Sequence, residues 1–230
     1  MPTTALQLVH RAVAPPLSRL LRPTVTGCER MPATGGVLLA ANHVSNLDNY
    51  VLSAVCPRPV AYLGKRELAR GVFGLFNTAM GMIPVDRGSG DLSALERIAD
   101  RLAAGDVIAV FPEGTRSPTG ELFRFRSGLA RIAHLAGTPV MPVGLRGTAT
   151  VWPRGRRPIP RRPARGALEV HFGELVDPPA APGGRARRQW TEALRARVGA
   201  LSRQPLADRF APVAHNSSTV QRWRHEDRDG

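Results

Sequence analysis

Apolar residues along this chain fall into short continuous runs that alternate with amphipathic segments. Runs that are apolar throughout are typical of strands buried on both faces of a sheet. The sequence predicts strands at about 24–27, 37–41, 60–63, 106–111, 139–145 and 168–172. Apolar positions recurring every three or four residues predict helices at about 50–56, 65–78, 91–104, 128–136 and 187–201. Strands that alternate with helices favour an α/β fold, with a mainly parallel central sheet flanked by helices.

The two ends of the chain differ from this central part. Residues 1–22 carry apolar side chains at helical spacing, and Pro15 with Pro16 is expected to break this amphipathic segment into two short helices. Such a segment suits packing against the protein and contact with a membrane equally well. Residues 203–230 are polar and rich in turn-forming residues, which predicts a disordered tail. Residues 23–202 are expected to form a single domain.

Charge changes the expected partners. Lys and Arg number 32 against 18 Asp and Glu, giving a net charge of +14, which attracts an anionic membrane surface or nucleic acid. Basic residues do not interleave with aromatic ones as in nucleic-acid binders, so the membrane is favoured. No apolar run is long enough for a spanning helix, so we expect peripheral contact with the membrane. The two cysteines form no disulfide framework, which suits a reducing compartment.

The first group of residues with candidate chemistry is Asn42-His43-Val44-Ser45-Asn46-Leu47-Asp48, which follows a buried strand. On one continuous helix, His43 and Asp48 would point about 140° apart. In a strand–turn–helix they can meet, and the carboxylate then fixes the imidazole tautomer so that the other ring nitrogen takes a proton. Helix capping by Asn42 or Ser45 explains the same residues equally well, so the spacing alone does not decide.

The second group is Phe111-Pro112-Glu113-Gly114-Thr115-Arg116-Ser117, which also follows a buried strand. Ligands of α/β sheets bind at such strand ends. Glu113 can bond hydroxyl groups, Gly114 allows close backbone approach, and Arg116 can pair with a phosphate. Arg87 is a candidate for a second phosphate contact, although alone it reads equally as a solvated charge.

In this order, these segments resemble the glycerolipid acyltransferases, most closely the 1-acylglycerol-3-phosphate O-acyltransferase (lysophosphatidic acid acyltransferase) type. The family's boxes are N-H-x4-D, G-x-I-x-x-x-R, F-P-E-G-T-R-S and V-x-P-[VI], with an additional K-x-E-L. This chain matches them at residues 42–48, 81–87, 111–117, 140–143 and 65–68. Where relatives often have F-K-x-G, this chain has Arg126 in place of the lysine, so the positive charge is kept.

The resemblance implies a role for each matched residue. His43 would be the general base and Asp48 would orient it. Acceptor and phosphate binding would fall to Arg87, Glu113, Gly114, Thr115 and Arg116, with Asn42, Ser45 and Arg126 in support. No metal or cofactor is implied. The acyl group would pass from acyl-coenzyme A or acyl carrier protein to 1-acyl-sn-glycerol-3-phosphate, giving phosphatidic acid, at the cytoplasmic side of the cell membrane.

Other functions stay open at this point. The acceptor could be another lyso-lipid or an amino-lipid, since the same boxes occur in relatives with different acceptors. A non-catalytic binder of anionic membrane or nucleic acid would need only the basic surface. A metal-dependent hydrolase would use His43 and Asp48 as ligands, and Cys56 is a weak candidate nucleophile. The sequence gives neither the acyl-chain length, nor the choice of donor, nor the oligomeric state.

Overall fold

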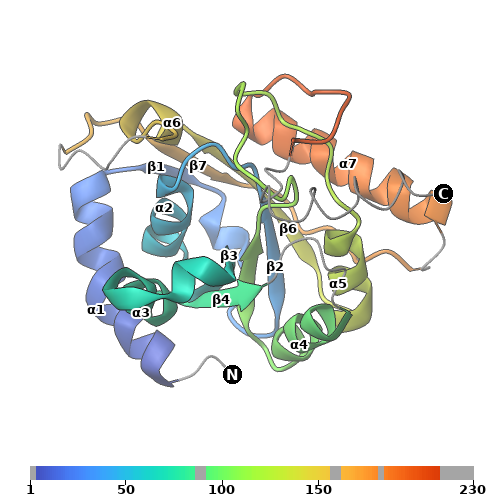
Figure 1. Cartoon of the computed structure of the whole chain (residues 1–230), viewed down its shortest axis with the longest axis horizontal. Helices are drawn as coiled ribbons and strands as arrows, with labels where there is room; N and C mark the ends of the chain where they lie inside the picture. The colour runs from blue at the N-terminus through green and yellow to red at the C-terminus, as the bar shows by residue number, and fades with distance from the viewer. Residues whose placement is uncertain (1–3, 86–91, 156–161, 181–183, 213–230) are drawn as a thin grey trace, which may run out of the picture.

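One mainly parallel sheet organises the parts of the chain that the computed structural model describes, residues 4–85, 92–155, 162–180 and 184–212. Its seven strands lie in the order β1-β7-β6-β2-β5-β3-β4 (Figure 1). Their bounds are Thr24–Thr26 (β1), Val37–Ala41 (β2), Val60–Lys65 (β3), Met82–Val85 (β4), Val107–Val110 (β5), Val140–Arg146 (β6) and Glu169–Phe172 (β7). Every neighbouring pair is parallel except β6 and β7. The predicted fold class is confirmed.

Helices cover both faces of this sheet. Their bounds are Thr4–Leu21 (α1), Leu47–Val55 (α2), Gly71–Ala79 (α3), Leu92–Ala103 (α4), Gly128–Ala136 (α5), Thr148–Val151 (α6) and Gly184–Ser202 (α7), with 3₁₀ turns at Cys28–Arg30 (η1) and Arg66–Ala69 (η2). Strand β2 shows how the layers form, because alternate side chains point to opposite faces. Val37 and Leu39 join the core under α1, α2 and α6, whereas Leu38 joins the core under α4, α5 and α7. None of the described helices is both long and apolar enough to cross a bilayer.

The first helix corrects one prediction. Pro15 and Pro16 lie inside α1, which runs unbroken from Thr4 to Leu21. Each proline lacks the N–H of a helical hydrogen bond, which normally destabilises a helix interior. Here one side of α1 packs against α2 and the core beside it through Val9, Val13 and Leu17. Tertiary packing of this apolar stripe holds the helix together, because packing contributes more to helix stability than local propensity does.

Residues 65–78 also differ from the single helix predicted for them. Lys65 ends β3, η2 follows, and α3 begins only at Gly71, whose φ of +67° lies in the left-handed region. A left-handed residue cannot continue a right-handed helix, so the segment divides there. The short elements β4 and α6 were not predicted, since four residues carry too little periodicity to reveal them.

The C-terminal segment, residues 203–212, is packed against the domain and corrects the predicted boundary at residue 203. The backbone of Leu122 donates to the carbonyl of Pro205 and accepts from the N–H of Ala207. The buried Arg195 guanidinium donates to the carbonyl of Ala207 at 3.0 Å. Ala207 also covers the Phe123 side chain, which is 1% exposed. This polar segment is ordered by backbone hydrogen bonds that no local pattern reveals, and residues 213–230 lie outside the described part.

Removal of this segment is expected to destabilise the domain. A chain ending at residue 202 would uncover Phe123 and leave Arg195 without the carbonyl of Ala207. We expect the free energy of unfolding to fall by about 2–5 kcal/mol relative to a chain ending at residue 212. Urea unfolding of the two truncated chains measures the difference. Equal stability would show that residues 203–212 contribute nothing to the core.

Candidate active site

The two groups of candidate residues meet because their strands are neighbours in the sheet. Strands β2 and β5 pair in parallel, with Ala40 opposite Val110, so both strands end at the same edge. The loop after β2, residues 42–48 (the His43 loop), therefore lies beside the turn after β5, residues 111–117 (the Glu113 turn). The His43 N–H donates to Glu113 Oε1 at 2.9 Å, and the His43 carbonyl accepts from the Ser117 N–H at 2.7 Å.

His43 and Asp48 form the central pair of the site. His43 Nδ1 lies 2.8 Å from Asp48 Oδ2, and the His43 side chain is 9% exposed and that of Asp48 fully buried. Since a carboxylate is an acceptor, this contact places a proton on Nδ1 and makes Nε2 the nitrogen that can accept one. The Phe111 ring stacks on the imidazole, with centroids 4.0 Å apart. The pair has the geometry of an oriented general base.

Asp48 is held by the strand–turn–helix around it. Its Oδ2 also accepts the backbone N–H groups of Val44 and Ser45, each at 2.8 Å. Asp48 lies in the first turn of α2, where the positive end of the helix dipole stabilises a carboxylate. Three donors to Oδ2 and this dipole together offset part of the cost of desolvating the charge. The turn thus brings together two residues that one continuous helix would keep apart.

Asn42 and Ser45, predicted as supporting residues, attach the His43 loop to other elements. The Asn42 amide exchanges two hydrogen bonds with the backbone of Leu145 in β6, at 2.9 and 2.7 Å. Ser45 Oγ donates to the carbonyl of Trp152 at 2.7 Å and accepts from the N–H of Leu47 at 3.1 Å. Both side chains are fully buried, so they fix the loop and do not face a ligand.

Glu113 occupies a different position from the predicted one. Its side chain is buried, and its two oxygens accept the N–H groups of His43 and Phe123 at 2.9 and 3.0 Å. It therefore braces the backbone of the site and is not placed to contact an acceptor. Burial raises the pKa of Glu113 to about 7, although its two hydrogen bonds act in the opposite direction.

The raised pKa of Glu113 gives stability a defined pH dependence. Its stabilising contribution is fully present below the ordinary pKa near 4.5 and is lost as the pH rises through about 7. Glu113→Gln removes this contribution. From pH 5 to pH 8 we therefore expect the free energy of unfolding of the wild type to fall, relative to that of the variant, by on the order of 2–3 kcal/mol. Urea unfolding at both pH values measures it, with Glu96→Gln as the matched control on the exposed side of α4. A difference independent of pH would contradict the assignment.

Arg116 belongs to a cationic pair that the sequence pattern did not single out. Arg154 Nη1 donates to the Arg116 carbonyl at 3.2 Å. Partial burial, followed by repulsion from Arg154, lowers the pKa of Arg116, while attraction to Asp48 opposes this change. Two neighbouring guanidinium groups favour binding of an anion. Arg154 is distant from Arg116 in the sequence, and only the fold places it beside the Glu113 turn.

Four predicted site residues remain: Gly114, Thr115, Arg126 and Arg87. Gly114 has a φ of +78°, and a Cβ there would lie 2.7 Å from Arg126 Nε, so the turn requires glycine. Arg126 supports the same turn by donating from Nε to the Glu113 carbonyl at 3.3 Å. Thr115 is partly exposed beside Arg116. Arg87 lies outside the described residues.

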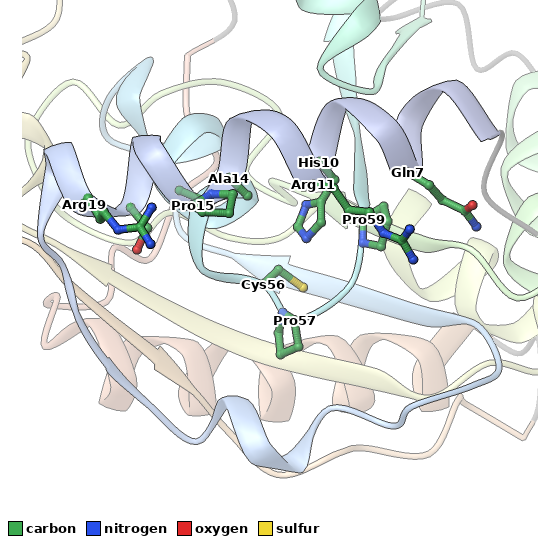
Figure 2. Close-up of a pocket in the computed structure, with 11 residues that line it drawn as sticks. Gln7, His10, Arg11, Ala14, Pro15, Arg19, Cys56, Pro57 and Pro59 are labelled. Atoms are coloured by element: carbon green, nitrogen blue, oxygen red, sulfur yellow. The ribbon is translucent and has the colours of Figure 1, made fainter.

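A separate groove of about 740 Å³ lies between α1 and the loop after α2 (Figure 2). Its lining includes His10, Arg11 and Cys56 but none of the predicted site residues. Burial raises the pKa of the Cys56 thiol to about 12, which keeps it protonated and argues against the candidate nucleophile. In the described ranges, no three His, Cys, Asp or Glu side chains gather as a metal site would require.

Comparison with known proteins adds the family context. A family model described as "Acyltransferase" matches residues 22–146. The chain is 35% identical to 1-acyl-sn-glycerol-3-phosphate acyltransferase alpha of Mus musculus over 127 residues, 54% of this chain and 45% of that protein. A 1-acyl-sn-glycerol-3-phosphate acyltransferase of Chlamydomonas reinhardtii is 35% identical over 153 residues, 64% of this chain and 45% of that protein. The chain thus spans about half the length of these relatives.

A solved structure shares the fold. The crystal structure of the 1-acyl-sn-glycerophosphate (LPA) acyltransferase from Thermotoga maritima superimposes with a TM-score of 0.62. The sequences are 24% identical, and the match covers 84% of this chain and 77% of the other. At this identity the likeness shows a shared fold and no more.

Proposed function

This chain belongs to the acyltransferase family, and we propose that it transfers a fatty acyl group from a thioester to the free hydroxyl of 1-acyl-sn-glycerol-3-phosphate, giving phosphatidic acid. The observation that carries the proposal is the His43–Asp48 contact of 2.8 Å beside the Arg116–Arg154 pair. A general base and an anion-binding group at one sheet edge are what a phosphate-bearing alcohol requires. The names of the relatives point to the same acceptor.

In the proposed reaction, His43 Nε2 removes the proton of the acceptor hydroxyl while the hydroxyl oxygen attacks the carbonyl carbon of the thioester. The oxygen–carbon bond forms, and the tetrahedral intermediate then expels the thiolate as the carbon–sulfur bond breaks. The protonated imidazole gives its proton to the departing sulfur, which restores His43. Asp48 stabilises the imidazolium between the two proton transfers and keeps the ring oriented. No step places the acyl group on the enzyme.

The acceptor phosphate is proposed to bind at Arg116 and Arg154. Arginine pairs with phosphate through two parallel hydrogen bonds, which would fix the position of the acceptor and so place its hydroxyl relative to His43. Arg87 is a further proposed contact. An amino-lipid acceptor lacking phosphate would gain nothing from this cationic pair, so a phosphate-bearing acceptor is favoured.

The proposed chemistry needs no metal or other cofactor, because a thiol is already a good leaving group. The donor is proposed to be acyl-coenzyme A or acyl carrier protein, both of which present the acyl group as a thioester. Both lipid substrate and product reside in membranes, and the net charge of +14 favours an anionic surface. We therefore propose a peripheral membrane location, and its cytoplasmic side stays a prediction.

The proposal is tested by offering acyl-coenzyme A and acyl carrier protein thioesters to the purified protein with a panel of acceptors. The panel contains lysophosphatidic acid, other lysophospholipids and an amino-lipid without phosphate. Thiol release gives the rate, and mass spectrometry identifies the lipid product. We expect turnover to be fastest with lysophosphatidic acid. Turnover with the amino-lipid alone, or with no acceptor, would overturn the proposal.

A further inference from the structure

Helix α3 has the reverse of the usual distribution of polar and apolar side chains. At helical spacing, Val72, Leu75, Phe76 and Ala79 form one stripe, and all four are exposed. Val72 is 88% and Leu75 72% exposed, whereas the polar Asn77 on the inner side is only 4% exposed. A surface helix of a soluble protein normally buries its apolar stripe. We call the four exposed residues the apolar face of α3.

The inner side of α3 is held by close backbone packing and by the hydrogen bonds of Asn77. A Cβ at Gly74 would lie 2.1 Å from the carbonyl carbon of Ala69, so the helix backbone packs directly on η2. Asn77 Oδ1 accepts the hydroxyl of Tyr50 at 3.0 Å, and Asn77 Nδ2 donates to the carbonyl of Leu68 at 3.3 Å. Close backbone packing and hydrogen bonds therefore hold α3 in place. These contacts do not account for the high exposure of Val72 and Leu75, which calls for another explanation.

The charges around α3 indicate what this face meets. Residues 71–79 contain no charged side chain. The preceding six residues contain Lys65, Arg66 and Arg70 against the single acid Glu67, which pairs with Lys65 at 2.9 Å. A basic segment next to an exposed apolar face complements the anionic headgroups and hydrocarbon of a bilayer. A second copy of this chain, itself strongly basic, would meet the same face with charge repulsion.

Aromatic rings link this face to the candidate active site. Phe76 lies 6.2 Å from Tyr50 between ring centroids, and Tyr50 stacks at 6.3 Å on Trp152. The Trp152 carbonyl accepts the hydroxyl of Ser45 in the His43 loop. Tyr and Trp are the side chains that favour the boundary between lipid and water. In Figure 1, α3 lies in front of the sheet beside α1.

We propose that the apolar face of α3 inserts into the outer part of an anionic lipid bilayer, while Lys65, Arg66 and Arg70 contact the headgroups. Nine residues are too short to cross a bilayer, so the helix lies in the interface. This docking surface would present the His43 loop to lipid substrates. The inference builds on the proposed function, but docking is measured without turnover, so the two can fail separately.

The test measures partitioning of the purified full chain onto vesicles of phosphatidylcholine with phosphatidylglycerol. Val72→Ser and Leu75→Ser are each expected to lower the partition coefficient about tenfold. Leu135→Ser is the matched control, since Leu135 is 52% exposed on α5 at the other face of the sheet. His43→Ala should bind vesicles like wild type, even if no acyl transfer is found for the wild-type protein. Equal partitioning of the α3 variants and wild type would overturn the proposal.

A second measurement reports insertion directly. A polarity-sensitive fluorophore attached at Val72→Cys in a Cys28→Ser background should shift to shorter wavelength when anionic vesicles are added. The same label at Leu135→Cys should not shift. A label at residue 72 that stays water-exposed on bound vesicles would overturn the proposal. So would shielding of that label in a lipid-free dimer seen by sedimentation, since a second copy would then cover the face.

Discussion

Replacing His43 with alanine is expected to lower kcat for acyl transfer by about 10²–10⁴-fold, the usual contribution of a general base. The variant removes the nitrogen proposed to accept the hydroxyl proton but leaves the Arg116–Arg154 pair in place. KM for the phosphate-bearing acceptor should therefore change much less than kcat, because ground-state binding is retained. Steady-state kinetics with lysophosphatidic acid separates the two quantities.

His134→Ala is the matched control for this prediction. His134 is a histidine remote from the site, and its Nδ1 lies 2.8 Å from the carbonyl of Pro179. Its replacement should leave kcat near the wild-type value. Circular dichroism and thermal unfolding of both variants check that the fold persists, since His43 also stacks on Phe111. Substantial activity in a folded His43→Ala protein would show that another group acts as the base.

Replacing Asp48 with asparagine is the second change with a large expected effect, also about 10²–10⁴-fold in kcat. The carboxylate oxygen accepts three N–H groups, from the His43 ring and from the backbone of Val44 and Ser45. Asparagine keeps the shape but removes the charge that stabilises the imidazolium. The acidic limb of the profile of kcat/KM against pH should therefore move to lower pH.

Asp106→Asn provides the control for replacing a buried aspartate. Asp106 is 4% exposed and pairs with Arg101 at 2.7 Å, outside the site. We expect this variant to lose stability while its pH profile stays where it is. If Asp48→Asn lowers stability but shifts neither kcat nor the pH profile, Asp48 would serve only the local fold.

The sequence by itself determined six of the seven strands, most helices and the candidate chemistry. Strands such as 37–41 are continuous apolar runs, and α4 has a clear period of three to four residues, so both are encoded locally. The order of the boxes, from Asn42 to Val143, was sufficient to indicate the family. The spacing of His43 and Asp48 did not by itself predict their contact, because helix capping explained the same residues, and only the resemblance to the family implied that they meet.

The tertiary structure alone decided how these parts combine. The pairing of β2 with β5 brings residues 43 and 113 within hydrogen-bond distance. Glu113 is buried there and holds the backbone of His43 and Phe123 by accepting their N–H groups. Long-range packing keeps α1 continuous through Pro15 and Pro16, and leaves the apolar face of α3 exposed. Each of these outcomes depends on contacts between residues far apart in the chain, where free energy of packing and desolvation outweighs local preference. A sequence pattern records local preference only, so these features emerged with the fold.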